Sequence, residues 1–146
     1  MDPHRFEELH AEHDAALREV ADLEGALGSP DVDQRRLEAA IATFLRYYDA
    51  RLEPHMRIEA AEVYPLLDRY LSTESPAALH REQQTVRDLV GGLRRLLARR
   101  DRGAAETEET RVAAQDLAIL LRELIRKEDR VYHPLLQRLL EGGRSE

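Results

Sequence analysis

The sequence predicts an all-α protein that folds as a bundle of four helices. Apolar residues recur every three or four positions in four long stretches, glycine and proline separate these stretches, and no stretch alternates as a β-strand does. Because the connections are short, neighbouring helices should pack antiparallel. The length of 146 residues fits one domain, residues 1–146, with a continuous core.

The first two helices are expected on either side of Gly28-Ser29-Pro30, which should end one and begin the next. Asp2-Pro3 supplies a cap and a proline at the first helical position. Pro54 predicts either a kink within the second helix or the start of a separate helical segment. The inward faces should carry Phe6, Leu9, His13, Ala16, Val20, Leu23 and Leu27, then Leu37, Ile41, Phe44, Tyr48, Leu52, His55, Glu59, Val63 and Leu66.

The third helix should begin at Ser75-Pro76, and Gly103 should separate it from the fourth. Their inward faces are expected to carry Leu79, Gln83, Val86, Val90, Leu93 and Leu97, then Leu117, Leu121, Leu124, Glu128, Val131 and Leu135. The same three- to four-residue spacing supports both assignments.

The two halves of the chain resemble each other. Leu9-His10-Ala11-Glu12-His13 aligns with Leu79-His80-Arg81-Glu82-Gln83 at an offset of 70 residues. At an offset of 69, Glu59 aligns with Glu128, and Pro65-Leu66-Leu67 with Pro134-Leu135-Leu136. The repeat predicts two helical hairpins related by a pseudo-twofold axis.

Composition excludes several classes of function. The chain has no cysteine, which rules out disulfides, thiolate metal sites and cysteine nucleophiles. Its net charge of −7, from 22 basic and 29 acidic residues, argues against nucleic acid as the main partner. The polar N-terminus does not resemble a signal peptide, and no apolar run approaches the roughly 20 residues that span a bilayer. We therefore expect a cytoplasmic protein without a membrane partner.

Five polar residues interrupt the apolar faces: His13, His55, Glu59, Gln83 and Glu128. His55 and Glu59 lie one helical turn apart, so their side chains converge. A buried carboxylate without a cation, a proton or hydrogen-bond donors costs several kcal/mol. A metal ion bound by imidazole and carboxylate groups would satisfy several of these residues together. A polar core without metal is the alternative.

Three segments resemble the hemerythrin-like (HHE cation-binding) domain: Glu12-His13, His55-Met56-Arg57-Ile58-Glu59, and Glu62-Val63-Tyr64-Pro65-Leu66-Leu67. The resemblance covers nearly the whole chain, including the helix order. It implies an up-down-up-down topology and two irons that are bridged by carboxylates and capped by histidines. Such domains serve in oxygen binding, in oxygen or iron sensing, or in iron handling.

By position, the resemblance implies that His13 and His55 cap one metal and that Glu59 and Glu128 are bridging carboxylates. Cation choice is open, because two histidines with carboxylates suit iron, zinc and manganese alike.

The second half departs from the family pattern, since Gln83 and Leu124 stand where the family has histidines. His80, one turn before Gln83, is an outside candidate for a metal ligand. Otherwise His10 and His80 would form a peripheral pair, or would simply be half-exposed flanking residues. His133 stands at the position equivalent to Tyr64 and is not expected to be a ligand. We expect a site for one metal, or a weakened site for two.

The predicted function is a non-catalytic metal-binding module that senses, binds or sequesters iron or oxygen. Its partners would be a metal ion and dioxygen or another small diatomic molecule. The alternative is a metal-free bundle that acts as a protein-interaction or regulatory module. A ferritin-like di-iron oxidoreductase would need Glu-x-x-His on two helices, and Glu7-Glu8-Leu9-His10 stands alone. Histidine phosphotransfer would need a lysine beside an exposed histidine, and Lys127 lies far from such a motif.

Overall fold

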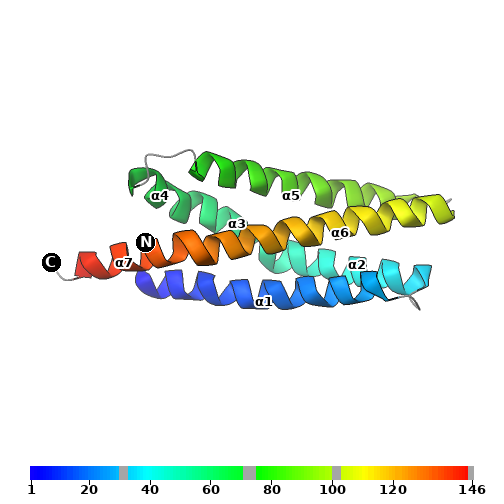
Figure 1. Cartoon of the computed structure of the whole chain (residues 1–146), viewed down its shortest axis with the longest axis horizontal. Helices are drawn as coiled ribbons and strands as arrows, with labels where there is room; N and C mark the ends of the chain where they lie inside the picture. Colours follow the sequence, from blue (N-terminus) through cyan, green and yellow to red (C-terminus); the bar gives the residue numbers. More distant parts are fainter. Residues whose placement is uncertain (30–32, 71–74, 100–102, 145–146) are drawn as a thin grey trace.

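The computed structural model describes residues 1–29, 33–70, 75–99 and 103–144, which form four long antiparallel helical rods (Figure 1). No strand occurs in these residues, so the predicted all-α class and the antiparallel packing are confirmed. Pro30, which was expected to begin the second helix, lies outside the described residues. Among the described helices, none combines the length and the hydropathy that a membrane-crossing segment needs.

The first rod is α1 (Pro3–Gly28). The Asp2 carboxylate caps it by accepting a hydrogen bond from the His4 backbone N–H at 3.0 Å, as predicted. The buried residues of α1 are those of the predicted inward face, and His13 is one of them.

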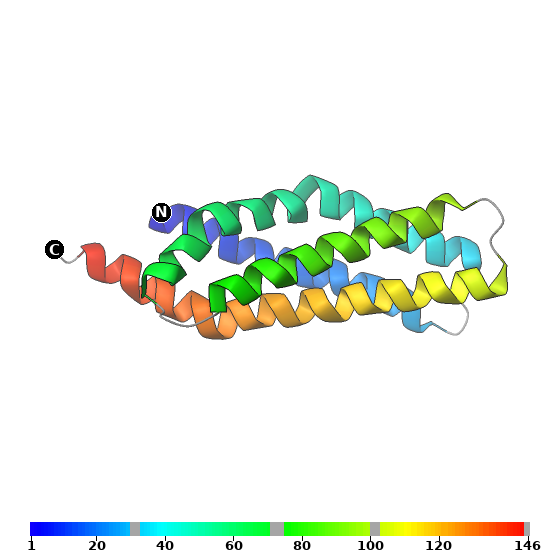
Figure 2. The same cartoon turned by 90° about the horizontal axis from the view of Figure 1, so that it is seen from above.

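The second rod is helical from residue 34 to residue 70 and has five segments: α2 (Gln34–Tyr47), η1 (Tyr48–Leu52), α3 (Glu53–Ile58), η2 (Glu59–Val63) and α4 (Tyr64–Tyr70). The Asp33 carboxylate caps its start by accepting from the Arg36 N–H at 2.8 Å. Pro54 therefore lies within a continuous helix, which bends near α3 (Figure 2). The interpretation of Pro54 as the start of a separate segment is wrong.

The remaining rods are α5 (Ser75–Ala98) and a longer one composed of α6 (Ala104–Lys127), η3 (Glu128–Tyr132) and α7 (His133–Arg144). Gly103 is the N-cap of the last rod, and its N–H donates to the Glu106 carboxylate at 2.9 Å. α1 packs against α2 and α6, and α5 packs against α6 and α4. Both ends of the chain lie at the same end of the bundle, where α7 extends beyond α1 (Figure 1).

The three segments named η are wider π-helical turns, and each ends just before the residue that precedes a proline. In each, the residue before the proline donates its N–H to the carbonyl five residues earlier. A proline has no N–H and its ring clashes with the carbonyl four residues back, so a wider turn relieves the conflict. η2 begins at Glu59 and η3 begins at Glu128, which matches the predicted 69-residue repeat.

Candidate metal centre

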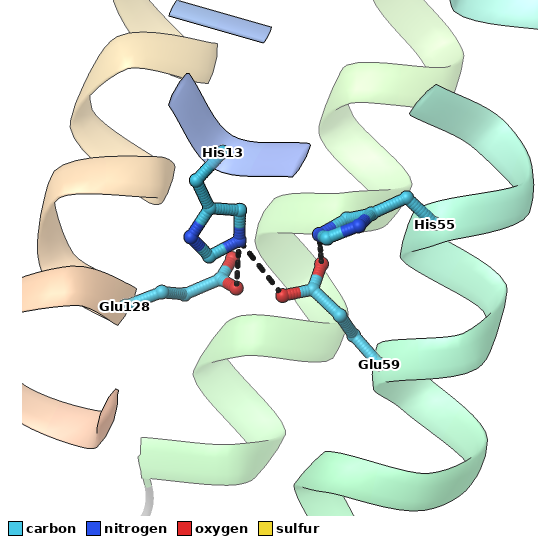
Figure 3. Close-up of side chains that lie close together, drawn as sticks. All are labelled: His13, His55, Glu59 and Glu128. Atoms are coloured by element: carbon cyan, nitrogen blue, oxygen red, sulfur yellow. Dashed lines mark hydrogen bonds and ion pairs between the residues drawn. The ribbon is translucent and has the colours of Figure 1, made fainter. Parts of the chain in front are cut away.

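Four buried polar residues from three of the rods meet in the interior of the bundle: His13, His55, Glu59 and Glu128 (Figure 3). Their exposed fractions lie between 3% and 6%. Each offers one nitrogen or oxygen atom, and these atoms all lie within 4.8 Å of one another. The structure thus brings together four of the five polar residues that interrupt the predicted apolar faces, and Gln83 is not in the group.

Glu59 is the centre of this group. One of its oxygens, Oε2, lies 3.3 Å from His13 Nε2, and the other, Oε1, lies 3.1 Å from His55 Nε2. Glu128 Oε2 lies 3.4 Å from His13 Nε2. The contact between His55 and Glu59 has no hydrogen-bond geometry, so His55 Nε2 is a buried nitrogen without a hydrogen-bond partner. Two imidazole nitrogens and two carboxylates therefore face a common point.

Two further carboxylates hold the histidines from outside. Asp129 Oδ1 lies 2.6 Å from His13 Nδ1, and Glu12 Oε2 lies 2.6 Å from His55 Nδ1. An Nδ1–H that donates to a carboxylate fixes the ring orientation and directs Nε2 into the group. This carboxylate–histidine arrangement is the one that supports histidine ligands in metal sites.

Sequence reasoning missed the roles of Glu12 and Asp129, although each is adjacent in sequence to a predicted ligand. Neighbouring helical residues point about 100° apart, so Glu12 cannot serve its neighbour His13. It reaches His55 on the facing rod instead, and Asp129 reaches His13 on α1. A carboxylate beside a predicted ligand was the available signal, but the partner depended on the packing.

Protons stabilise the group when no metal is bound. Burial alone would lower the pKa of His13, but its contacts with Asp129, Glu128 and Glu59 outweigh burial and raise that pKa to about 12. Burial also opposes charge on His55, whose interaction with Glu59 nevertheless raises its pKa. The surrounding carboxylates therefore favour the protonated form of both rings.

The two buried glutamates differ in charge. Burial, and then the negative charge of Glu59, raise the pKa of Glu128 well above its usual value. Burial acts in the same direction on Glu59, but its contacts with Glu128, His13 and His55 hold its pKa below the usual range. The opposite directions of the two pKa shifts favour a proton on Glu128 beside an ionised Glu59, as expected for closely placed carboxyl groups.

His80, the fifth predicted ligand, does not join the group. It lies on the exposed side of α5, where its ring packs edge-on against Tyr64 with centroids 5.0 Å apart. The alternative of a peripheral pair of His10 and His80 is not observed, because the His10 ring packs 3.7 Å from that of His133 and His80 packs on Tyr64. The other alternative, flanking residues that are at least partly exposed, agrees with the structure. His133 in turn stacks on Phe6 and lies outside the four-residue group.

At the two positions where the family has further histidines, this chain has a glutamine and a leucine. Gln83 is 1% exposed, and its Nε2 donates to the Met56 carbonyl at 3.0 Å and to the Tyr64 hydroxyl at 2.9 Å. Leu124 is buried and offers only an aliphatic side chain. Neither position supplies an imidazole, as the sequence indicated.

A small cavity of about 20 Å³ lies against the group. His13, Glu59 and Glu128 line one side of it, and apolar residues such as Phe6 and Leu67 line the rest. This volume has room for about one water-sized molecule.

The comparisons with known proteins agree with this geometry. A family model described as the hemerythrin HHE cation-binding domain matches residues 4–136. This range contains all four residues of the group and the two outer carboxylates. No curated protein and no solved structure matches the chain.

Proposed function

Since the chain belongs to the hemerythrin HHE cation-binding domain family, we propose that it binds a divalent metal ion through His13, His55, Glu59 and Glu128. The observation that carries the proposal is the convergence of two imidazole nitrogens, each anchored through Nδ1 by an outer carboxylate, on two buried glutamates. His55 Nε2 supports it, because this buried nitrogen makes no hydrogen bond and becomes available as a ligand once the ring gives up its proton.

Charge balance also favours a divalent ion. Two neutral imidazoles and two ionised carboxylates carry a net charge of −2, which one divalent cation neutralises in place of the protons. Nitrogen and oxygen donors of this kind suit Fe(II), Zn(II) and Mn(II), and we propose iron as the physiological ion. Because Gln83 and Leu124 supply no imidazole, we propose a single ion in this buried site.

The proposed role is non-catalytic sensing, binding or sequestration of iron or oxygen. Bound iron would supply a redox-active centre to which a diatomic molecule can bind. The chain contributes a small, mostly apolar cavity beside His13, Glu59 and Glu128, which fits dioxygen in size and polarity. Tyr64 and Leu67 line its inner wall and keep bulk water away from the carboxylates.

A metal-free interaction module is the second candidate. Gln83 and Leu124 favour it, because a domain that has lost two imidazoles has begun to lose its site. The raised pKa values of His13 and Glu128 also support it, because protons on these two groups would offset the buried negative charge without a metal.

Metal analysis separates the two candidates. Protein produced with iron supplied should contain roughly one tightly bound ion per chain, whereas His55→Ala and Glu59→Gln variants should contain far less. His4→Ala, which alters an exposed histidine on α1, is the matched control and should retain the ion. Equal metal content in the parent and in both site variants, measured by elemental analysis, would support the metal-free module. A visible absorption spectrum of the aerobic protein adds a second readout.

The outer carboxylates, Glu12 and Asp129, should affect metal affinity nearly as strongly as the ligands do. Glu12→Gln or Asp129→Asn is expected to weaken metal binding by about 10- to 100-fold, because each leaves a ligand imidazole less firmly oriented and less basic. Competition with a chelator of known affinity for Zn(II) measures the change. Asp22→Asn, at an exposed position of the same helix as Glu12, should leave the affinity unaltered. An unchanged affinity in both carboxylate variants would contradict the proposed orientation of the rings.

A further inference from the structure

The side chain of Tyr64 carries a hydroxyl group into the interior of the bundle, and the proposed metal site does not use it. Tyr64 is 1% exposed and is the first residue of α4, in the same rod as Glu59. It lines the small inner cavity of about 20 Å³ together with His13, Glu59 and Glu128. Of the residues that line this cavity, Tyr64 and Tyr132 carry hydroxyl groups. Tyr64 therefore places a phenol ring beside three of the four proposed ligands.

Gln83 fixes the direction of the hydrogen bond at this hydroxyl group. Its Nε2 donates to the Met56 carbonyl at 3.0 Å and to the Tyr64 hydroxyl oxygen at 2.9 Å. A carbonyl only accepts, so the amide nitrogen of Gln83, and not its oxygen, must face Met56, and both amide hydrogens are then used. The Tyr64 oxygen is therefore an acceptor in its bond with Gln83, and the hydroxyl hydrogen is left for another acceptor.

Within the part of the chain that the structure describes, the hydroxyl hydrogen of Tyr64 has no acceptor. The hydrogen bond of the Tyr64 side chain there is the one that it accepts from Gln83. A buried donor without an acceptor costs free energy, so a partner is expected. Burial, and then the negative charges of Glu128 and Glu59, raise the pKa of Tyr64, so the hydroxyl group keeps its proton and stays a donor.

The inner cavity is the space in which such a partner would bind. It has room for about one water-sized molecule, and apolar side chains such as Leu67 and Leu136 supply much of the wall that the proposed ligands leave. A small molecule in this cavity would find few polar groups besides the ligands. In a buried setting of this kind, one well-directed hydrogen bond contributes strongly to which molecule is held.

We propose that the Tyr64 hydroxyl group donates a hydrogen bond to the small molecule held in the inner cavity, and that Gln83 orients this hydroxyl group. The inference rests on the proposed function and narrows its ligand class to diatomic molecules that have an atom able to accept a hydrogen bond. It also accounts for Gln83, which is a buried amide at a position where the family has a histidine. Gln83 is then a positioning residue that acts through Tyr64.

Nitric oxide binding to the Fe(II)-loaded full-length chain tests this assignment, with iron content measured in every protein. In the parent, the N–O stretching frequency in the infrared spectrum should shift when heavy water replaces light water, because the hydroxyl proton exchanges with solvent. In Tyr64→Phe, this isotope shift should disappear, and nitric oxide should dissociate about fivefold faster, as expected for the loss of one hydrogen bond. The iron content of Tyr64→Phe should equal that of the parent, because Tyr64 is not a proposed ligand.

Tyr132→Phe is the matched control, because it removes the other hydroxyl group that lines the cavity, and it should keep the isotope shift. Gln83→Met retains the Tyr64 hydroxyl group but leaves its direction unfixed, so the shift should shrink; this variant serves if Tyr64→Phe does not fold. An iron-loaded Tyr64→Phe that behaves as the parent does, a shift lost in Tyr132→Phe, or an iron-loaded parent that binds no nitric oxide would overturn the inference alone. A parent without bound iron would overturn the proposed function, and the inference with it.

Discussion

Saturation with metal should raise the melting temperature of the protein by about 5–10 °C. An ion that binds only the folded state at a hundredfold excess over its Kd stabilises it by about 2.7 kcal/mol. In a domain of this size, each kcal/mol corresponds to roughly 2–4 °C. The effect should vanish in His55→Ala, whereas His4→Ala should retain it. Thermal unfolding with and without Zn(II) measures the shift.

The stabilisation that metal binding produces should grow with pH, because the metal-free protein becomes less stable as the pH rises. In the metal-free protein, the pKa of His13 is about 12 in the folded state and 6.5 in the unfolded chain. Its contribution to stability is therefore full below pH 6.5 and declines as the pH rises through this interval, by about 1.4 kcal/mol per unit. His55 and Glu128, whose pKa values are also raised, act with the same sign. Glu59 acts oppositely, but its contribution is lost only in acid, below pH 4.5.

The metal ion acts in the opposite direction to these protons, because it binds the deprotonated ligands. Between pH 6.5 and about 8.5, the metal-free protein should lose stability while its metal affinity increases. The melting-temperature shift produced by Zn(II) should therefore be larger at the higher pH. A shift that stays constant or shrinks would show that protons and metal do not compete for this group.

The fold was predictable because its helices obey a simple periodicity. The buried residues of α1 are those that recur every three or four positions in the sequence. The π-helical turns were not predicted, because only the kink expected from Pro54 was considered, and Pro65 and Pro134 were used merely as markers of the repeat. All three prolines share one conflict with the helix, and the wider turns at Glu59 and Glu128 result from it.

Those residues of the candidate site that interrupt the apolar pattern could be predicted from the sequence. His13, His55, Glu59 and Glu128 stand where apolar residues are expected, and the structure buries all four together. His10 and His133 give no such signal, because both are only partly buried and lie beside the apolar faces. Their contact depends on how α1 crosses the start of α7, which a periodic pattern in single helices does not specify.

The second large effect concerns the half of the site that lacks imidazoles. Gln83→His combined with Leu124→His is expected to create an additional tight metal site. In the repeat, Gln83 is equivalent to His13 and Leu124 is equivalent to His55. The two new rings would therefore approach Glu59 and Glu128 from the α5 and α6 side. Both glutamates could then bridge two ions. Each single variant supplies one ring and should add little.

Without metal, the double variant should be less stable than the parent. Gln83→His breaks the hydrogen bonds to Met56 and Tyr64, and Leu124→His buries a polar ring, at a cost of about 1–3 kcal/mol each. Addition of Zn(II) should then produce a larger melting-temperature shift than in the parent, together with roughly one more tightly bound ion per chain by elemental analysis. Gln84→His, at the exposed neighbouring position, is the matched control and should add no tight site. A folded double variant that binds only as many tight ions as its parent would show that the space around Gln83 and Leu124 cannot hold a metal, whatever side chains line it.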